Sequence, residues 1–336
     1  MRLLRFESQV PNFGDDLNDM IWSALVPDLF VGDNAKANDD AAFVGIGTIV
    51  GIDPGVSKLL EVFSSGAGYT ATDRWAGLDV RYHCVRGPVT ARVLDLSPNI
   101  ALTDGAILTP LVDRFKFAGG GLMRRVVVVP HYETIAFPGW EQATRLAGFD
   151  LVDPRDTPES VIAVLASAEL VLTESLHGAI IADTYGVPWR GFAVSRNFST
   201  AKWADWTASV DLHVDITMVP PPDPMPLLRF GKRSEPFGTG FVLDTDDAVR
   251  EFRNRIEPEV SSALLKSQSK RLLEHFPRAR RFLGFSPERT AHALVNLAAR
   301  DPILSLVRKR DAMRDEMLVR LEIFAKRYGT SLAAIG

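Results

Sequence analysis

The chain has 336 residues, of which 46% are hydrophobic and 24% charged, and its formal net charge is −4. This length suits two domains better than one core, and the mixed, slightly acidic charge excludes the positive field that nucleic-acid binding needs. One cysteine, Cys84, excludes an internal disulfide framework and a cysteine-based zinc site, which favours a reducing compartment such as the cytoplasm.

The amino-terminal residues lack the apolar core of a signal peptide. The longest apolar run, residues 41–52, is too short and too rich in glycine to span a bilayer. We therefore expect a cytoplasmic protein without a membrane span.

Short apolar runs alternate with helical patterns through residue 190, which predicts βα units around a largely parallel sheet. In the first half we expect strands at 2–7, 41–46, 59–64, 80–85 and 100–103, and helices at 16–25 and 88–95. These elements define an α/β lobe over residues 1–112. The following stretch, residues 113–124, contains three successive glycines and predicts a hinge.

The alternation restarts with a run of four valines and predicts a second α/β lobe over residues 125–220. Strands are expected at 124–131, 149–152, 169–173 and 187–193, and helices at 140–147, 158–167 and 175–185. Prolines at 219–226 forbid regular structure there. Helical patterns at 245–276 and 287–328 then predict a mainly helical extension over residues 221–336.

The last of these helical patterns carries one apolar stripe beside charged residues. Met313, Met317, Leu321 and Phe324 follow each other at spacings of three and four. We expect this stripe to dock on the lobes or on a partner, with a membrane surface as the alternative.

Polar residues cluster where predicted strands turn into helices, the edge at which open α/β folds bind ligands. Within residues 172–189, Glu174 and Ser175 follow a strand and His177 falls in the first helical turn. Free N–H groups at a helix start attract phosphate or carboxylate, and an imidazole can add a hydrogen bond or a proton. In the alternative interpretation Ser175 only caps the helix and His177 is a neighbour with satisfied hydrogen bonds.

The turn at residues 10–19 places Asn12, Gly14, Asp15 and Asp16 after the first strand. One aspartate there can cap the following helix and have no other role. The crowding of an amide, a glycine and two acids favours a ligand site, because glycine lets a ligand approach the backbone closely.

Further candidates lie at other strand ends. Arg86 has the fixed charge to hold phosphate or carboxylate, or it is an exposed salt-bridging residue. Asp104 also suits a plain turn, and His131 brings a second imidazole to the edge of the second sheet. Arg196 and Lys202 stand among aromatic residues, which suit sugars and anions or simple domain packing.

Several common motifs are missing from the sequence. It contains no GxxxxGK[ST], GxSxG or HExxH pattern, which argues against a P-loop nucleotide site, a hydrolase elbow and a zinc helix. Residues 45–51, GIGTIVG, imitate a dinucleotide fingerprint, but the third glycine comes one residue late. They indicate a loop that a ligand can approach and not an NAD site.

Seven motifs in order resemble the polysaccharide pyruvyl transferase family, particularly its branch that forms ketals on bacterial exopolysaccharides. They are NFGDDLN at 12–18, GIGTIV at 45–50, VRGPVTARVL at 85–94, TDGAIL at 103–108, VPHYE at 129–133, TESLHGAIIADTYGVPW at 173–189 and KWADW at 202–206. The resemblance covers about residues 1–210 of the chain. It implies an α/β fold of two Rossmann-like lobes in a GT-B-like arrangement, with phosphoenolpyruvate as donor substrate and no separate cofactor.

The resemblance also implies the reaction: transfer of a pyruvyl group to a sugar of a lipid-linked exopolysaccharide repeat unit at the inner face of the cytoplasmic membrane. His177 matches the family motif and is the expected acid, with Asp15 or Asp16 as base and Glu174 or His131 as alternatives. Substrate binding is expected from Asn12, Gly14, Arg86, Asp104, His131, Glu174, Ser175, Arg196 and Lys202.

Some relatives carry arginine at the position of Ser175, so another cation must supply that charge here. We expect Arg86, Arg196 or Lys202 to do so. The scheme requires no metal, although the acidic pair at 15–16 could bind a divalent ion. Peripheral membrane contact and a homo-oligomer stay open, and no nucleic-acid partner is expected.

Two rival functions remain at this point. A GT-B glycosyltransferase that uses a nucleotide sugar would need the same two lobes, helix start and histidine. A non-catalytic glycan-binding protein could keep the fold and would tolerate the loss of His177 and Arg86.

Overall fold

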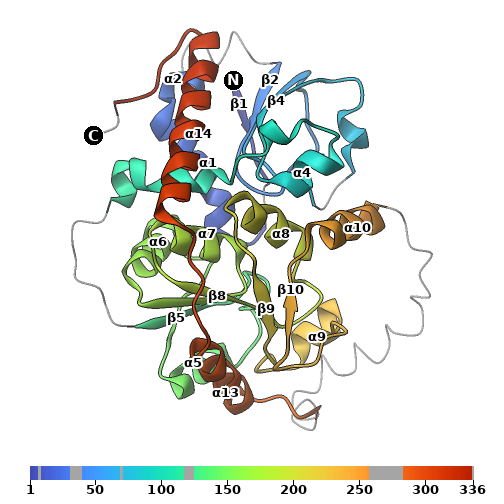
Figure 1. Cartoon of the computed structure of the whole chain (residues 1–336), viewed down its shortest axis with the longest axis vertical. Helices are drawn as coiled ribbons and strands as arrows, with labels where there is room; N and C mark the ends of the chain where they lie inside the picture. The colour runs from blue at the N-terminus through green and yellow to red at the C-terminus, as the bar shows by residue number, and fades with distance from the viewer. Residues whose placement is uncertain (7–8, 31–39, 69–70, 117–124, 257–282, 335–336) are drawn as a thin grey trace.

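The computed structural model describes residues 1–6, 9–30, 40–68, 71–116, 125–256 and 283–334. It contains two β-sheets, one in each half of an elongated molecule (Figure 1). Helices cover both sheets, as the alternating sequence pattern predicts. The mixed α/β class with parallel sheets is confirmed.

The amino-terminal sheet has four parallel strands in the order β1-β2-β3-β4. They are β1 (Arg2–Leu4), β2 (Ala41–Val44), β3 (Leu59–Phe63) and β4 (Asp79–Cys84). The helices of this part are α1 (Phe13–Leu25), α2 (Pro27–Phe30) and α4 (Pro88–Val93), with short 3-10 turns η1 (Thr72–Trp75), η2 (Pro98–Ile100), η3 (Gly105–Leu111) and η4 (Asp113–Phe115).

Two predictions for this half are wrong in detail. The strand expected at 100–103 is only an isolated bridge between Ala101 and Val85, because the turn η2 immediately precedes it. The first helix begins at Phe13 with Asn12 as the N-cap residue, so neither aspartate caps it. Asp15 and Asp16 instead lie in the first turn of α1, where carboxylates stabilise the positive helix end.

The carboxyl-terminal sheet has six strands in the order β10-β9-β8-β7-β5-β6. The parallel strands are β5 (Val126–Val129), β6 (Asp150–Leu151), β7 (Leu170–Thr173), β8 (Trp189–Ala193) and β9 (Asp215–Met218), and β10 (Gly240–Val242) is an antiparallel edge strand. Its helices are α5 (Trp140–Ala147), α6 (Pro158–Ser167), α7 (Leu176–Thr184) and α8 (Thr200–Ser209).

Within the described residues, the remaining helices are α9 (Met225–Phe230), α10 (Thr245–Ile256), α13 (Pro287–Ala298) and α14 (Val307–Arg327). Helix α9 begins inside the proline-rich stretch that was expected to be irregular, because Pro226 occupies its first turn, where proline is tolerated. Residues 117–124 of the expected hinge and 257–276 of an expected helix lie outside the described residues. No helix in the described ranges is long and apolar enough to cross a bilayer.

Helix α14 returns to the amino-terminal half and packs there (Figure 1). The expected apolar stripe faces the protein, since Met317, Leu321 and Phe324 are fully buried. The ring of Phe324 lies 5.3 Å from that of Phe43 in β2. Docking of the stripe on the lobes is therefore confirmed over the membrane alternative.

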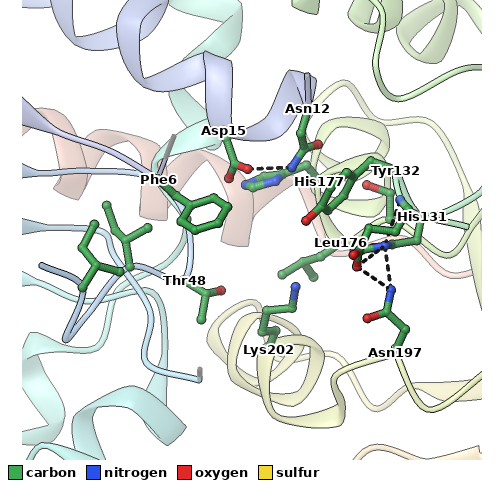
Figure 2. A pocket seen from close by; sticks show the side chains of 15 residues that line it. Phe6, Asn12, Asp15, Thr48, His131, Tyr132, Leu176, His177, Asn197 and Lys202 are labelled. Carbon is green, nitrogen blue, oxygen red and sulfur yellow. Dashed lines mark hydrogen bonds and ion pairs between the residues drawn. The ribbon is translucent and has the colours of Figure 1, made fainter. Parts of the chain in front are cut away.

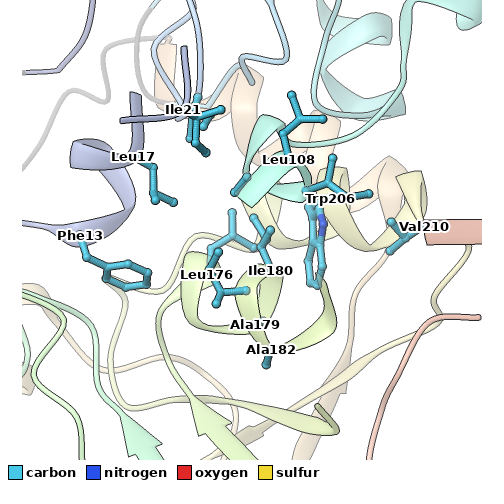
Figure 3. Close-up of a cluster of buried hydrophobic side chains, with 14 of the residues drawn as sticks. Phe13, Leu17, Ile21, Leu108, Leu176, Ala179, Ile180, Ala182, Trp206 and Val210 are labelled. Atoms are coloured by element: carbon cyan, nitrogen blue, oxygen red, sulfur yellow. The ribbon is translucent and has the colours of Figure 1, made fainter. Parts of the chain in front are cut away.

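One apolar cluster joins the two halves (Figure 3). It takes side chains from α1 and η3 on one side and from α7 and α8 on the other. They include Phe13, Leu17, Ile21, Leu108, Leu176, Ile180 and Trp206. All of them are buried. An interface of this kind is stabilised by the hydrophobic effect and holds two lobes as one unit.

Candidate active site

A cavity of about 330 Å³ lies where the carboxyl ends of strands from both sheets meet (Figure 2). The amino-terminal half contributes Phe6, Asn12, Asp15, Gly47, Thr48, Ile49 and Ile52. The other half contributes His131, Tyr132, Glu133, Ser175, Leu176, His177, Asn197 and Lys202. The cavity thus brings together the amino-terminal acid, both strand-end histidines and one lysine, from segments far apart in the sequence.

Helix α7 places His177 in this cavity. The helix follows strand β7 directly, and Ser175 is its N-cap residue, whose Oγ accepts a hydrogen bond from the Gly178 N–H at 3.4 Å. The His177 ring packs on Gly14 so closely that a Cβ at residue 14 would lie 1.9 Å from Nδ1. Gly14 therefore makes room for the imidazole and does not itself line the cavity.

Asp104 lies behind His177 and outside the cavity. Its Oδ2 is 3.8 Å from Nε2 of His177, and its Oδ1 accepts a hydrogen bond from the Ala106 N–H at 3.0 Å. Burial raises the pKa of Asp104 to about 6. Burial also lowers the pKa of His177 to about 4, because desolvation outweighs the nearby Asp15 carboxylate. In the unliganded protein His177 is therefore neutral near pH 7.

The two amino-terminal acids face different surroundings. Asp15 lines the cavity, and its carboxylate accepts a hydrogen bond from the Asn12 side chain at 2.8 Å (Figure 2). Burial raises the pKa of Asp15, with His177 acting in the opposite direction. Asp16 lies outside this cavity, in a neighbouring pocket that Arg5 and Asp15 also line. Of the two, Asp15 has the position of a base.

Lys202 brings a positive charge to the cavity from α8, and its ammonium group points into it (Figure 2). Together with the start of α7 at Ser175, it gives this end of the cavity the character of an anion site. Of the three cations that were expected to supply the charge, Lys202 alone lines the cavity.

A second imidazole forms the opposite wall. Nδ1 of His131 accepts a hydrogen bond from the Asn197 amide at 3.0 Å, and the same amide donates to Glu133 at 2.9 Å (Figure 2). Burial lowers the pKa of His131 to about 3, and Lys202 adds to the effect. His131 is therefore neutral near pH 7 and suits hydrogen bonding.

Arg86 is buried and forms an ion pair that links the two halves of the molecule. Its side chain is 1% exposed, its Nε lies 3.0 Å from Oδ2 of Asp205 in α8, and its Nη1 donates to Thr48 Oγ1 at 2.7 Å. The Asp205 carboxylate also accepts hydrogen bonds from the backbone N–H and the hydroxyl of Thr90 in α4. Arg86 is thus not the exposed residue of the alternative interpretation, and it does not line the cavity.

Two other expected site residues lie elsewhere. Glu174 is buried and its carboxylate accepts the backbone N–H groups of His131 and Val194, at 3.0 and 3.3 Å, so it holds strand ends together. Burial raises its pKa to about 7. Arg196 is exposed and lies over Gly231, outside the cavity.

Part of the chain that lines this site matches a known protein family. Residues 124–196 match the family model described as polysaccharide pyruvyl transferase. This segment belongs to that family. It runs from β5 to the loop after β8 and therefore contains His131, Ser175 and His177.

A curated relative extends the match. The chain is 32% identical over 214 residues to the succinoglycan biosynthesis protein ExoV of Rhizobium meliloti (strain 1021). The aligned region covers 62% of this chain and 65% of the relative's length. The family expected from the seven motifs is thus confirmed. No solved structure matches the chain significantly, and its GT-B-like arrangement stays a prediction.

Proposed function

We propose that the chain transfers the pyruvyl group of phosphoenolpyruvate to a sugar of a lipid-linked exopolysaccharide repeat unit, at the inner face of the cytoplasmic membrane. The products are a pyruvate ketal and phosphate. One observation carries the proposal: Asp15, His177 and Lys202 meet in one cavity of a chain whose residues 124–196 belong to the pyruvyl transferase family. The relative's name, which refers to succinoglycan biosynthesis, supports a polysaccharide acceptor.

The anion site at the start of α7 suits the donor. Phosphoenolpyruvate carries a phosphate and a carboxylate, and Lys202 with the backbone N–H groups near Ser175 offers positive charge and donors to one of them. This anion site lies beside His177. The reacting carbon atoms of a donor bound there would therefore lie within reach of the imidazole.

The reaction itself balances without another reactant. Two sugar hydroxyls bond to C2 of phosphoenolpyruvate, the C2–O bond to phosphate breaks, and the methylene carbon C3 gains a proton. The two hydroxyl protons end on C3 and on the departing phosphate. The protein therefore has to move protons between these atoms and stabilise the charge on the phosphate.

His177 and Asp15 have the positions for these transfers. In the free protein His177 is neutral near pH 7, but an adjacent phosphate and carboxylate would favour its protonated form. We assign the protonation of C3 to His177. Asp15, on the facing helix α1, accepts the proton of an attacking hydroxyl.

The direct test combines the purified protein, phosphoenolpyruvate and a lipid-linked oligosaccharide extract. Mass spectrometry should detect an added pyruvate ketal, and a phosphate assay should detect equal amounts of released phosphate. In a parallel reaction, a nucleotide sugar replaces phosphoenolpyruvate; transfer of its sugar to the extract, with no ketal formed in the first reaction, would instead establish the glycosyltransferase rival.

Ligand-induced stabilisation separates the rivals without an acceptor. Phosphoenolpyruvate should raise the melting temperature of the protein, and nucleotide sugars should not, because only a ligand that binds the folded state stabilises it. Stabilisation by glycans alone, unchanged in His177→Ala, would favour the non-catalytic glycan-binding protein.

A further inference from the structure

Two buried polar atoms face each other behind the cavity. Nε2 of His177 and Oδ2 of Asp104 are 3.8 Å apart, and neither has a hydrogen-bond partner among the residues that the structure describes. A buried polar atom without a partner costs about 1–3 kcal/mol, and such atoms are rare in folded proteins. Two of them aimed at one another indicate a hydrogen bond that forms when the site is in its working state.

The orientation of Asp104 is fixed by the turn that it caps. Its Oδ1 accepts the N–H of Ala106, which is the second residue of η3. This bond leaves Oδ2 as the oxygen that faces His177. Because Asp104 is fully buried and does not line the cavity, it cannot touch a substrate there.

The ring of His177 is held as tightly from the other side. Its Nδ1 packs on Gly14 in α1, and the ring meets Phe13 edge-on at 6.3 Å between centroids. A shift of about 1 Å would bring Nε2 and Oδ2 to the normal hydrogen-bond distance of about 2.9 Å. A carboxylate can only accept in such a bond, so the ring would carry its proton on Nε2.

We propose that Asp104 is a positioning residue that accepts the Nε2–H of His177 and thereby reserves Nδ1 for proton exchange in the cavity. The assignment rests on the proposed function, in which His177 carries the proton. It changes the expected role of Asp104, because this residue acts through the imidazole and not on the substrate.

Other charged groups also act on this pair. Asp15 approaches from α1 and favours the protonated ring, whereas Lys202 from α8 and Arg86 after β4 disfavour it. Asp205 acts on Asp104 from α8. A substitution of Asp104 leaves these four groups in place, so it isolates the contribution of one partner.

Asp104→Asn gives a sharp test, because the turn decides which way the amide points. The N–H of Ala106 requires an oxygen, so the side-chain NH₂ replaces Oδ2 opposite His177 and donates to Nε2. The neutral ring must then carry its proton on Nδ1. We expect the tautomer to invert and kcat to fall by about 100-fold or more, with KM for phosphoenolpyruvate changed less than about threefold.

The tautomer is read from the ¹⁵N chemical shifts of histidine-labelled protein, in which His177→Gln assigns the signal among the six histidines. Asp104→Ser is the matched control. It keeps an oxygen for the turn but places nothing against Nε2, so we expect neither tautomer to dominate and a smaller loss of kcat than in the asparagine variant.

The outcomes are separable. Wild-type protein with the proton on Nδ1 would overturn the proposal, even if Asp104→Asn failed to fold. So would an asparagine variant that is folded and keeps the wild-type tautomer. The predicted tautomers in a protein that transfers no pyruvyl group would support the positioning role and overturn the proposed function instead.

Discussion

The two junctions at β4–α4 and β7–α7 share a strand–turn–helix pattern but have different roles. At the start of α4, the Asp205 carboxylate accepts the Thr90 N–H and pairs with Arg86, so the protein's own anion fills the site. At the start of α7, Ser175 and His177 face an open cavity. One junction therefore binds the two lobes together, and the other remains available for a ligand.

The difference shows what decides whether a helix start becomes a ligand site. Both junctions combine a strand end, a polar residue and a helix, so the local pattern is the same. The deciding group is a carboxylate 119 residues away from Arg86 in the sequence, which no local motif reveals.

Removal of the internal anion should have the largest effect. Asp205→Ala leaves the buried guanidinium of Arg86 without its carboxylate, which should lower the free energy of unfolding by about 3–5 kcal/mol. Urea unfolding measures the change, with Asp113→Ala as control for an exposed ion pair that should not matter. A loss below about 1 kcal/mol would show that the pair does not hold the lobes.

Removal of the His177 imidazole at the β7–α7 junction should affect turnover and leave the fold intact. His177→Ala should lower kcat by about 100-fold or more, since a positioned proton donor contributes that much. Phosphate release under saturating donor gives kcat, and His213→Asn serves as control at an exposed histidine. Near-normal turnover of the alanine variant would remove His177 from the reaction.

Lys202, the cation beside the start of α7, should affect the affinity for the donor. Lys202→Met keeps the apolar stem but loses the charge, and we expect phosphoenolpyruvate to bind about 10-fold more weakly, or 1.4 kcal/mol. Calorimetric titration measures the affinity. Arg196→Met, outside the cavity, should bind the donor normally. Equal losses in both variants would contradict the placement of the donor beside α7.

His131, in the cavity wall opposite α7, should have a smaller and pH-dependent effect on stability. As the pH falls below about 6.5, the unfolded chain protonates His131 while the folded protein, with a pKa of about 3, keeps it neutral. Stability is therefore lost on acidification, by about 1.4 kcal/mol per pH unit between pH 6 and 4. The stability of His131→Asn, measured by urea unfolding, should fall less steeply over this range. Parallel curves for the two proteins would show that the folded protein does not lower the pKa of His131.

Most of the fold was predictable because buried parallel strands are continuous apolar runs. The four valines of β5 and the run LVLT of β7 are examples of such runs. Strand β9 and helix α8 were not predicted. The strand is four residues long, and the two tryptophans of α8 suggested a binding surface when in fact they are buried packing residues.

Site residues could be predicted only where a regular element fixes the direction of the side chain and points it into the cavity. The first turn of α7 fixes His177, and α1 fixes Asp15. Asn197, next to the expected Arg196, was missed because neighbouring residues of a loop point to opposite sides. Glu174 stands at the right strand end, but the N–H groups of His131 and Val194 turn its carboxylate inward.

The apolar cluster under the cavity limits how ligands come and go. If the lobes swung apart, the side chains shown in Figure 3 would meet water, at a cost on the order of 10 kcal/mol, which rivals the whole stability of a typical domain. A wide clamshell motion is therefore too expensive. Substrates must therefore reach the cavity, which the half-exposed Phe6 lines, without a separation of the two lobes.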